Sequence, residues 1–443
     1  MPVVVPERIS FLVTGDEDQR KETWNGESMR TGGRGVSGSE SAFVSFAEHW
    51  AGLGHNATIF ASFCRESYFK GVHYVADMNK AIEDATILVI LPWFRHLDEL
   101  SINSNVSSSP SSLSSIPALK YLIIDYQGVG IPPNLENFMK KHTSVKVVSM
   151  FPSEWTRRAV YSNARKHNVN LFVLSGKSFI INNPLLSDVV AAVDANVTGT
   201  SLTNNNGSSR NGRGWREPRS FVWAAAFERG GSIALKVFHL INGSHFKIMT
   251  YLNIAQRSEN NAMVYIDPEL GHLQRRWRNG DKRVSLTIGM DKQGVLKEMA
   301  QASYFLYPLT LSSTSNYPGS VHKDTFALCV AEALAMGAIV ITWPVAALPE
   351  LYPESESGVV YLSFPSLANE PALKGYDYVQ DPALVSTDAI GLMVNKIQEL
   401  ESKGIAYLDS LRAKGMIFSR TKYSMDAIGR QLDAMSSELE FRI

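Results

Sequence analysis

Cysteine is scarce in this chain, and long apolar runs are missing. Cys64 and Cys329 are its two cysteines among 443 residues, and they lie far apart in the sequence. Two distant thiols do not make a disulfide framework, so the composition favours a reducing, cytoplasmic location. The first residues lack the basic segment and apolar core of a signal peptide. Because no run of about 18 apolar residues exists, we expect no transmembrane segment, while peripheral contact with a membrane stays open.

The chain also lacks a net charge. Lys and Arg total 43, and Asp and Glu total 43. A nucleic-acid-binding protein usually carries an excess of basic residues, so we expect no nucleic-acid partner. The basic cluster at Arg275, Arg276 and Arg278 is interpreted as a solvated surface turn. Hydrophobic residues make up 44% of the chain, which is enough to form a globular core.

Short apolar runs alternate with helical patterns along the first half of the chain. The helical pattern covers residues 39–55, where Phe43, Phe46, Ala47 and Trp50 recur at helical spacing. The apolar runs are continuous rather than alternating, which is typical of parallel strands buried on both faces. We expect strands at residues 8–14, 56–62, 85–92, 120–126 and 145–151. The alternation predicts an α/β, doubly wound domain.

The same pattern starts again after residue 219. Strands are expected at 220–227, 245–254, 303–309 and 338–344, and helices at 232–241, 292–302 and 324–337. Residues 101–117 are rich in Ser, and residues 197–218 are rich in Gly, Asn and Ser, which favours loose or mobile loops. We therefore expect an N-terminal domain at 1–185, a linker or mobile insertion at 186–219, a second domain at 220–415 and a C-terminal helix at 416–443.

The sharpest motif is HKDTFALCVAEALAMGAIVITWPVAALPEL, residues 322–351. Its two carboxylates, Asp324 and Glu332, would lie about 12 Å apart along a helix, too far to act on one atom. That distance argues against a glycosidase-like acid and base pair and suits an elongated ligand. A helix beginning at this point would offer free N–H groups near Thr325, Phe326 and Ala327 as an anion site. Gly337 is expected to end the helix.

Two further segments support this motif. TGGRGVSGSESAFVSFAEHWAGLGHNATIFA, residues 31–61, contains Gly35, Gly38 and Ser39, where the backbone could approach phosphates closely. FVWAAAFERGGSIALKVFHLI, residues 221–241, places Arg229 before two glycines at the end of an expected strand.

These motifs resemble those of glycosyltransferase family 4, the glycosyl transferases group 1, in the expected order from about residue 31 to 362. Weaker similarities occur at residues 147–160 and 178–185. The resemblance implies the GT-B fold, in which two Rossmann-like domains face a cleft. It also implies a retaining, metal-independent transfer from a nucleotide-diphosphate sugar to a hydroxyl of a glycan, glycolipid or glycoprotein, without a cofactor.

The resemblance assigns roles to individual residues. Glu332 would hold the ribose hydroxyls, and Asp324 would lie by the donor sugar as a catalytic residue, although the family usually has Glu at that position. Arg229 would be the catalytic cation. Its positive charge would stabilise the negative charge that the departing diphosphate gains in the transition state. Gly35, Gly38, Ser39, Thr325, Phe326 and Ala327 would complete the donor site.

The chain departs from the family pattern at two points. A second cation is often present about five residues before Arg229, but Trp223, Ala224 and Ala225 stand there, so Arg34 or Lys236 are the alternatives. Relatives often place a His at the tip of an N-domain strand, where this chain has Asp125, Tyr126 and Gln127, with His96 as a spare candidate. These departures leave two other functions open, a GT-B nucleotide-sugar epimerase and a catalytically weak nucleotide-sugar-binding subunit.

Overall fold

The computed structural model describes most of the expected elements and divides the chain into two compact units. The first unit comprises residues 1–28, 37–184 and 425–443, and the second comprises 29–36 and 185–424. The residues that the structure describes are 6–13, 24–31, 38–61, 64–82, 85–94, 97, 119–167, 169, 176–200, 216, 218–225, 229–250, 255–257, 263–265, 282–308, 324–362 and 382–440. The predicted loop at 101–117 lies outside them.

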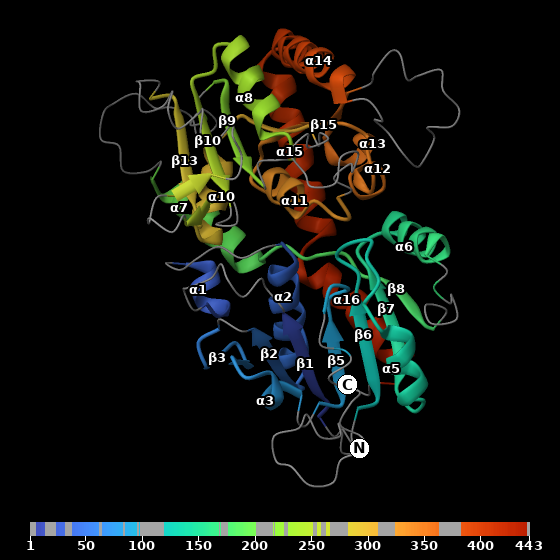
Figure 1. The fold of residues 1–443 in the computed structure, drawn as a ribbon. Helices are drawn as coiled ribbons and strands as arrows, with labels where there is room; N and C mark the ends of the chain where they lie inside the picture. The colour runs from blue at the N-terminus through green and yellow to red at the C-terminus, as the bar shows by residue number, and fades with distance from the viewer. Residues whose placement is uncertain are drawn as a thin grey trace. The chain divides into compact units, whose positions relative to one another are not determined.

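An eight-stranded sheet forms the centre of the first unit, with strand order β3-β4-β2-β1-β5-β6-β7-β8. All neighbouring strands are parallel except β3 and β4, which are antiparallel. This arrangement confirms the parallel sheet predicted from the continuous apolar runs (Figure 1). The elements are α1 (Gly26–Arg30, whose last residues are grouped with the second unit), β1 (Arg8–Val13), α2 (Gly38–Gly52), β2 (Asn56–Ala61), β3 (Ser67–Phe69), β4 (Val72–Val75), α3 (Met78–Ile82), β5 (Ile87–Ile90), β6 (Tyr121–Asp125), α5 (Leu135–Lys141), β7 (Lys146–Phe151), α6 (Glu154–Lys166), β8 (Ser178–Ile180) and α16 (Met425–Glu438).

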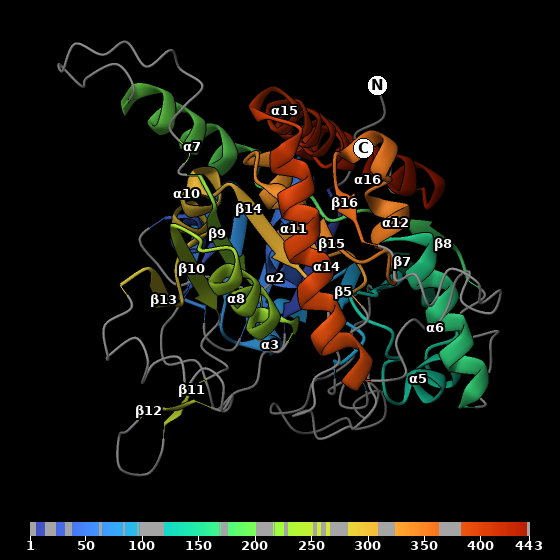
Figure 2. The same ribbon diagram turned by 90° about the horizontal axis from the view of Figure 1, so that it is seen from above.

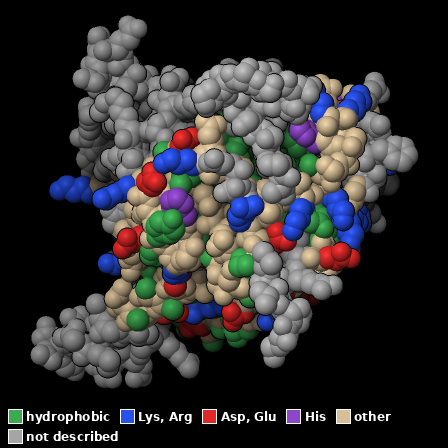
Figure 3. Space-filling view, turned by 90° about the horizontal axis from the view of Figure 1, so that it is seen from below, with side chains coloured by type: hydrophobic (Ala, Val, Ile, Leu, Met, Phe, Trp, Pro, Cys, Tyr) green, Lys and Arg blue, Asp and Glu red, His purple; other side chains and the backbone are tan. Residues whose placement is uncertain are grey.

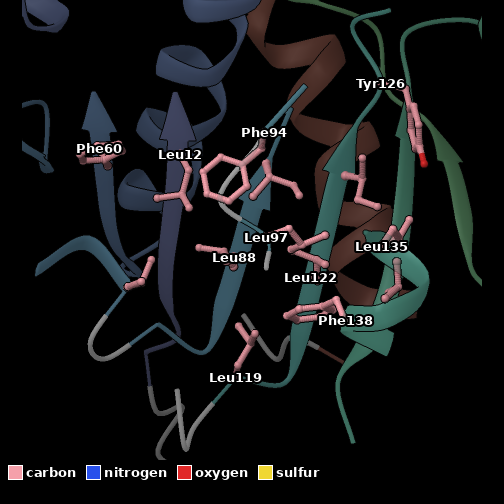
Figure 4. Close-up of a cluster of buried hydrophobic side chains, with 14 of the residues drawn as sticks. Leu12, Phe60, Leu88, Phe94, Leu97, Leu119, Leu122, Tyr126, Leu135 and Phe138 are labelled. Atoms are coloured by element: carbon pink, nitrogen blue, oxygen red, sulfur yellow. The ribbon is translucent and has the colours of Figure 1, made fainter. Parts of the chain in front are cut away.

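Both faces of this sheet are covered because successive side chains of each strand point to opposite sides. Leu12 of β1 joins a cluster with Leu88, Leu122 and Phe138 that also includes residues of α3, α5 and α6 (Figure 4). The next residue back, Phe11, packs instead on Phe43 and Trp50 of α2, and α16 lies against α2. The first unit is therefore doubly wound, as the sequence predicts.

A six-stranded, all-parallel sheet forms the centre of the second unit, with strand order β13-β10-β9-β14-β15-β16. Helix α8 packs on β9 and β14, and α14 packs on α8. Helices α10 and α11 lie next to each other, with α7 against α10 and α15 against α11 (Figure 2). The elements are α7 (Ser187–Thr200), β9 (Ser220–Ala224), α8 (Gly231–Leu240), β10 (His245–Thr250), β11 (Ala255–Arg257), β12 (Met263–Tyr265), β13 (Val284–Ile288), α10 (Lys292–Gln301), β14 (Tyr304–Tyr307), α11 (Leu328–Ala335), β15 (Ile339–Thr342), α12 (Leu348–Leu351), α13 (Glu354–Ser357), β16 (Val360–Tyr361), α14 (Pro382–Ser402) and α15 (Ile405–Lys422).

The described parts of the expected linker at 186–219 have defined structure. Helix α7 occupies its first part and packs on α10. Near its end, the Arg216 guanidinium donates to the carbonyls of Ala302 (2.5 Å) and Met336, which lie just after α10 and α11. A cation is favourable at helix C-termini because unpaired carbonyls gather there. Burial lowers the pKa of Arg216 to about 9.

Acidic and basic side chains are both present across the face shown in Figure 3, in agreement with the balanced charge of the sequence. Within the described residues, no helix combines the length and apolar composition that a membrane span requires.

Candidate functional site

Three polar side chains meet at the carboxyl edge of the second unit's sheet. Tyr307 is the last residue of β14, and Arg229 follows the neighbouring strand β9 and precedes α8. An Arg229 N–H donates to Asp324 Oδ2 at 2.8 Å and to the Tyr307 hydroxyl at 3.3 Å, and that hydroxyl donates to Asp324 Oδ2 at 2.5 Å. The edge beyond the carboxyl ends of parallel strands is where open α/β sheets bind ligands. The structure thus brings the two residues predicted as catalytic, Asp324 and Arg229, into direct contact.

Arg229 has N–H donors that its partners among the described residues do not use. Its side chain is 38% exposed, while that of Asp324 is 9% exposed. The buried Nε–H of Arg229 has no hydrogen-bond partner among the described residues. Guanidinium groups carry five N–H donors in a planar fork that suits phosphate. Asp324 therefore holds one arm of the fork, and the remaining donors are left for a ligand.

The segment before α11 differs from the prediction. The helix begins at Leu328 rather than at Asp324, because Ala327 adopts a left-handed conformation (φ 53°, ψ 60°). Asp324 Oδ1 accepts the backbone N–H groups of Ala327 (2.6 Å) and Phe326 (3.3 Å). The expected free N–H groups at the start of the helix are thus partly bound by the chain's own carboxylate. The prediction was wrong about the helix start because a local side-chain-to-backbone hydrogen bond competes with helical geometry.

Burial keeps the neighbouring acidic groups protonated. It is the main cause that raises the pKa of the Tyr307 phenol well above its usual value, and the Asp324 carboxylate adds to it. Burial followed by Asp324 also raises the pKa of the Cys329 thiol to about 12. At neutral pH Tyr307 is therefore a hydrogen-bond donor, and Cys329 is a thiol rather than a nucleophilic thiolate.

Glu332 lies further along α11 and pairs with a lysine that was not among the predicted site residues. Lys292 Nζ donates to Glu332 Oε1 at 2.7 Å, and each side chain is 7% exposed. Among the described residues, Oε2 of Glu332 accepts no hydrogen bond. Lys292 compensates the buried negative charge of Glu332. The second carboxylate oxygen can therefore accept a hydrogen bond from a ligand hydroxyl without the burial of another charge.

A local signal for Lys292 did exist in the sequence. It is the first residue of α10, directly after the N-cap Asp291. A lysine in the first turn of a helix is unfavourable against the helix dipole, which makes this position unusual but names no partner. Which carboxylate it meets, 40 residues away, could not be read from the local pattern.

The remaining predicted donor-site residues are distributed as follows. Thr325, Phe326 and Ala327 are buried next to the Asp324 carboxylate in the second unit. Gly38 and Ser39 open α2 in the first unit, and Gly35 lies outside the described residues. Of the alternative cations, Lys236 is exposed on α8 and Arg34 lies outside the described residues.

The tip of β6 in the first unit holds a polar cluster in place of a histidine. Asp125 is 1% exposed, and both its oxygens accept from the Gln127 amide, at 3.0 and 2.9 Å. Gln127 and Asn183 exchange two amide hydrogen bonds of 2.8 and 2.7 Å. Burial raises the pKa of Asp125 to about 7, although the Gln127 hydrogen bond opposes the shift. His96 lies outside the described residues.

Comparison with known proteins extends this picture at the level of the fold. No protein-family model matches the chain, and no curated protein sequence matches it. Among solved structures, sucrose-phosphate synthase from Thermosynechococcus elongatus is similar with a TM-score of 0.59 and 11% identity, over 98% of this chain and 99% of that one. The α,α-trehalose-phosphate synthase (UDP-forming) from Burkholderia vietnamiensis has a TM-score of 0.55 at 9% identity, with coverage of 98% and 99%.

The catalytic domain of Starch Synthase IV from Arabidopsis thaliana, bound to ADP and acarbose, has a TM-score of 0.54 at 11% identity, with coverage of 98% and 99%. These likenesses span almost the whole of each chain. They confirm the predicted fold class, because the chain has the two-unit α/β fold of GT-B glycosyltransferases. At such low identity the likeness concerns the fold, and function has to be argued from the site.

Proposed function

We propose that the protein is a retaining, metal-independent glycosyltransferase that moves a sugar from a nucleotide-diphosphate sugar to an acceptor hydroxyl. The observation that carries the proposal is the contact between Arg229, Asp324 and Tyr307 at the carboxyl edge of the second unit's sheet, with Glu332 on the helix that follows. Arg229 and Tyr307 stand at the ends of neighbouring strands, where open α/β sheets bind ligands. The resemblance to family 4 supports this reading, and no cofactor beyond the donor is required.

In this proposal the free N–H groups of Arg229 bind the diphosphate. As the bond between the sugar anomeric carbon and the phosphate oxygen breaks, negative charge grows on that oxygen, and a fixed cation stabilises it. The acceptor hydroxyl forms the new bond to the anomeric carbon on the same face, and its proton passes to the departing phosphate oxygen. Asp324 keeps the guanidinium in place, and Oε2 of Glu332 accepts a hydrogen bond from a ribose hydroxyl.

One observation favours a second candidate, a catalytically weak nucleotide-sugar-binding subunit. Both oxygens of Asp324 are already hydrogen-bonded within the protein, to Arg229, Tyr307 and the backbone of residues 326 and 327. A carboxylate occupied in this way has little capacity left for a donor sugar.

Incubation of the purified protein with a panel of nucleotide sugars separates the two candidates. Release of nucleoside diphosphate, with transfer of the sugar to water or to an acceptor, supports a transferase. Thermal stabilisation by a nucleoside diphosphate without any release of product supports a binding subunit, since mass action raises stability with any ligand of the folded state.

Substitution of Arg229 tests the role of its charge. Arg229→Ala should lower kcat about 100-fold, the loss typical when one preorganised donor to a developing anion is removed. The affinity for the bare nucleoside should stay within about twofold, because Arg229 is assigned to phosphate. Arg219→Ala is the matched control, since Arg219 pairs with Glu401 at 2.7 Å elsewhere in the same unit. Equal kcat values for Arg229→Ala and Arg219→Ala would mean that another residue binds the phosphate.

A further inference from the structure

We propose that Trp93, next to Gly128 at the carboxyl edge of β5 and β6, is a stacking platform for a pyranose ring of the acceptor. This inference rests on the proposed function, because it names where a sugar acceptor binds in the first unit.

Trp93 is unusual among the tryptophans that the structure describes. Trp24, Trp50, Trp223 and Trp343 are each at most 3% exposed, and Trp155 is half-buried, whereas Trp93 is 43% exposed. A large apolar side chain left in water forfeits the free energy that burial would contribute. An exposed indole at a sheet edge where ligands bind is therefore a candidate contact surface.

The ring is presented on a fixed turn. Trp93 lies in the turn directly after β5, which is closed by a hydrogen bond of 3.0 Å from the Phe94 N–H to the Leu91 carbonyl. Leu91 is 2% exposed and Phe94 is fully buried, and Figure 4 shows Phe94 within the core cluster of the first unit. The residues on either side of the turn are thus anchored in the core, while the indole remains at the surface. A rigid aromatic contact costs little conformational entropy on binding.

Gly128 keeps one edge of the ring uncovered. A Cβ atom placed on Gly128 would lie 3.5 Å from Cζ3 of Trp93, which is van der Waals contact. Any longer side chain at position 128 would therefore lie against the indole. Because β5 and β6 are parallel neighbours, the turn after β5 and the segment after β6 meet at the same edge of the sheet.

The residue before Gly128 is polar, and its side chain is held in place. Gln127 precedes Gly128, and its amide is held by Asp125 and by the reciprocal pair with Asn183. Ligand sites typically combine an apolar wall with a few oriented polar groups. A pyranose ring matches both features, since one face carries C–H groups that pack on an indole and its rim carries hydroxyls that need hydrogen-bond partners.

Saturation-transfer NMR without any donor tests the platform. The probes are the methyl pyranosides of glucose, galactose, mannose and N-acetylglucosamine, with adenosine and uridine as flat aromatic competitors. At least one glycoside should receive saturation from the wild-type protein, most strongly at its ring C–H protons. Trp93→Ala should weaken its binding about tenfold. Trp93→Phe, which keeps an aromatic ring, should retain part of it.

Tyr68→Ala is the matched control, because Tyr68 is 75% exposed on β3 of the same unit and should not affect binding. The inference is overturned if no glycoside receives saturation from the wild type, if Trp93→Ala binds as well as Tyr68→Ala, or if only the nucleosides bind. Release of nucleoside diphosphate in the donor assay reports the proposed function separately, so failure of one is distinguishable from failure of the other.

Discussion

At the scale of single residues, we expect the ion pair between Lys292 and Glu332 to affect both the stability of the fold and the binding of nucleotide. Its two side chains are 7% exposed, and Nζ and Oε1 are 2.7 Å apart. Removing water from two charges costs free energy that their mutual attraction offsets only when both partners are present. We therefore expect two effects from a substitution of Glu332, the loss of the proposed ribose contact and the loss of the negative charge that faces Lys292.

A double variant separates these effects. Glu332→Gln alone should lower the free energy of unfolding by about 3–5 kcal/mol, the usual cost of breaking a buried pair, and weaken nucleotide affinity about tenfold. Lys292→Met combined with Glu332→Gln should restore most of the stability but not the affinity. Urea unfolding and nucleotide titration of both variants measure the two quantities. Wild-type affinity in the double variant would show that Glu332 does not bind the ribose.

Asp125 predicts a dependence of stability on pH. Its pKa is raised from 3.8 to about 7 by burial, so the folded protein holds this proton more tightly than the unfolded chain. Stability should therefore fall as the pH rises from about 4 to about 7 and level off above that. Asp125→Asn should remove this contribution. The unfolding free energy of the variant minus that of the wild type should therefore be larger at pH 8 than at pH 5, by about 1 kcal/mol or more. Thermal unfolding of both proteins at the two pH values measures it, and an unchanged difference contradicts the shift.

At the scale of elements, the segment before α11 shows where a local pattern was not sufficient. The continuous apolar runs predicted the main strands because burial on both faces leaves a direct mark in the sequence. The start of α11 has no such mark. Asp324 is held by Arg229, which is 95 residues away, and by Tyr307. In that position its other oxygen accepts the backbone N–H groups of the two residues before α11. Tertiary contacts of this kind override helix propensity.

Two substitutions of Asp324 test this account. Asp324→Ala removes the backbone contacts and the ion pair and should lower the local stability of α11 by about 1–3 kcal/mol. Asp324→Asn keeps an oxygen that can accept from the Ala327 N–H, so its loss should be smaller. Hydrogen exchange of the α11 amides gives the local opening free energy of each variant. Equal losses in the two variants would mean that the ion pair with Arg229, not the backbone contact, supports the segment.

At the scale of the whole molecule, each unit is assembled from segments that are far apart in the sequence. The first unit takes its last helix, α16, from the end of the chain after some 240 residues that belong to the second unit. The amphipathic pattern predicted a helix there, and the resemblance implied its return to the N-terminal domain. The particular contacts were beyond prediction, because they depend on α2: Trp50 Nε1 donates to Ser436 Oγ at 3.3 Å, and His49 Nε2 lies 2.7 Å from Asp433 Oδ1.

The stability of the first unit should therefore depend on α16. Ile428, Leu432 and Met435 are fully buried on this helix, whereas Arg430 is exposed. Leu432→Ala should lower the opening free energy of the α2 and β1 amides by about 2–5 kcal/mol, since it leaves a cavity in the core. Arg430→Ala, the control on the same helix, should change it by less than about 0.5 kcal/mol. Because α16 is grouped with the first unit, the β9 and β14 amides of the second unit should keep their protection in both variants. Hydrogen exchange followed by mass spectrometry reads both units in one experiment, and an equal loss of protection in the second unit would show that the two units unfold as one.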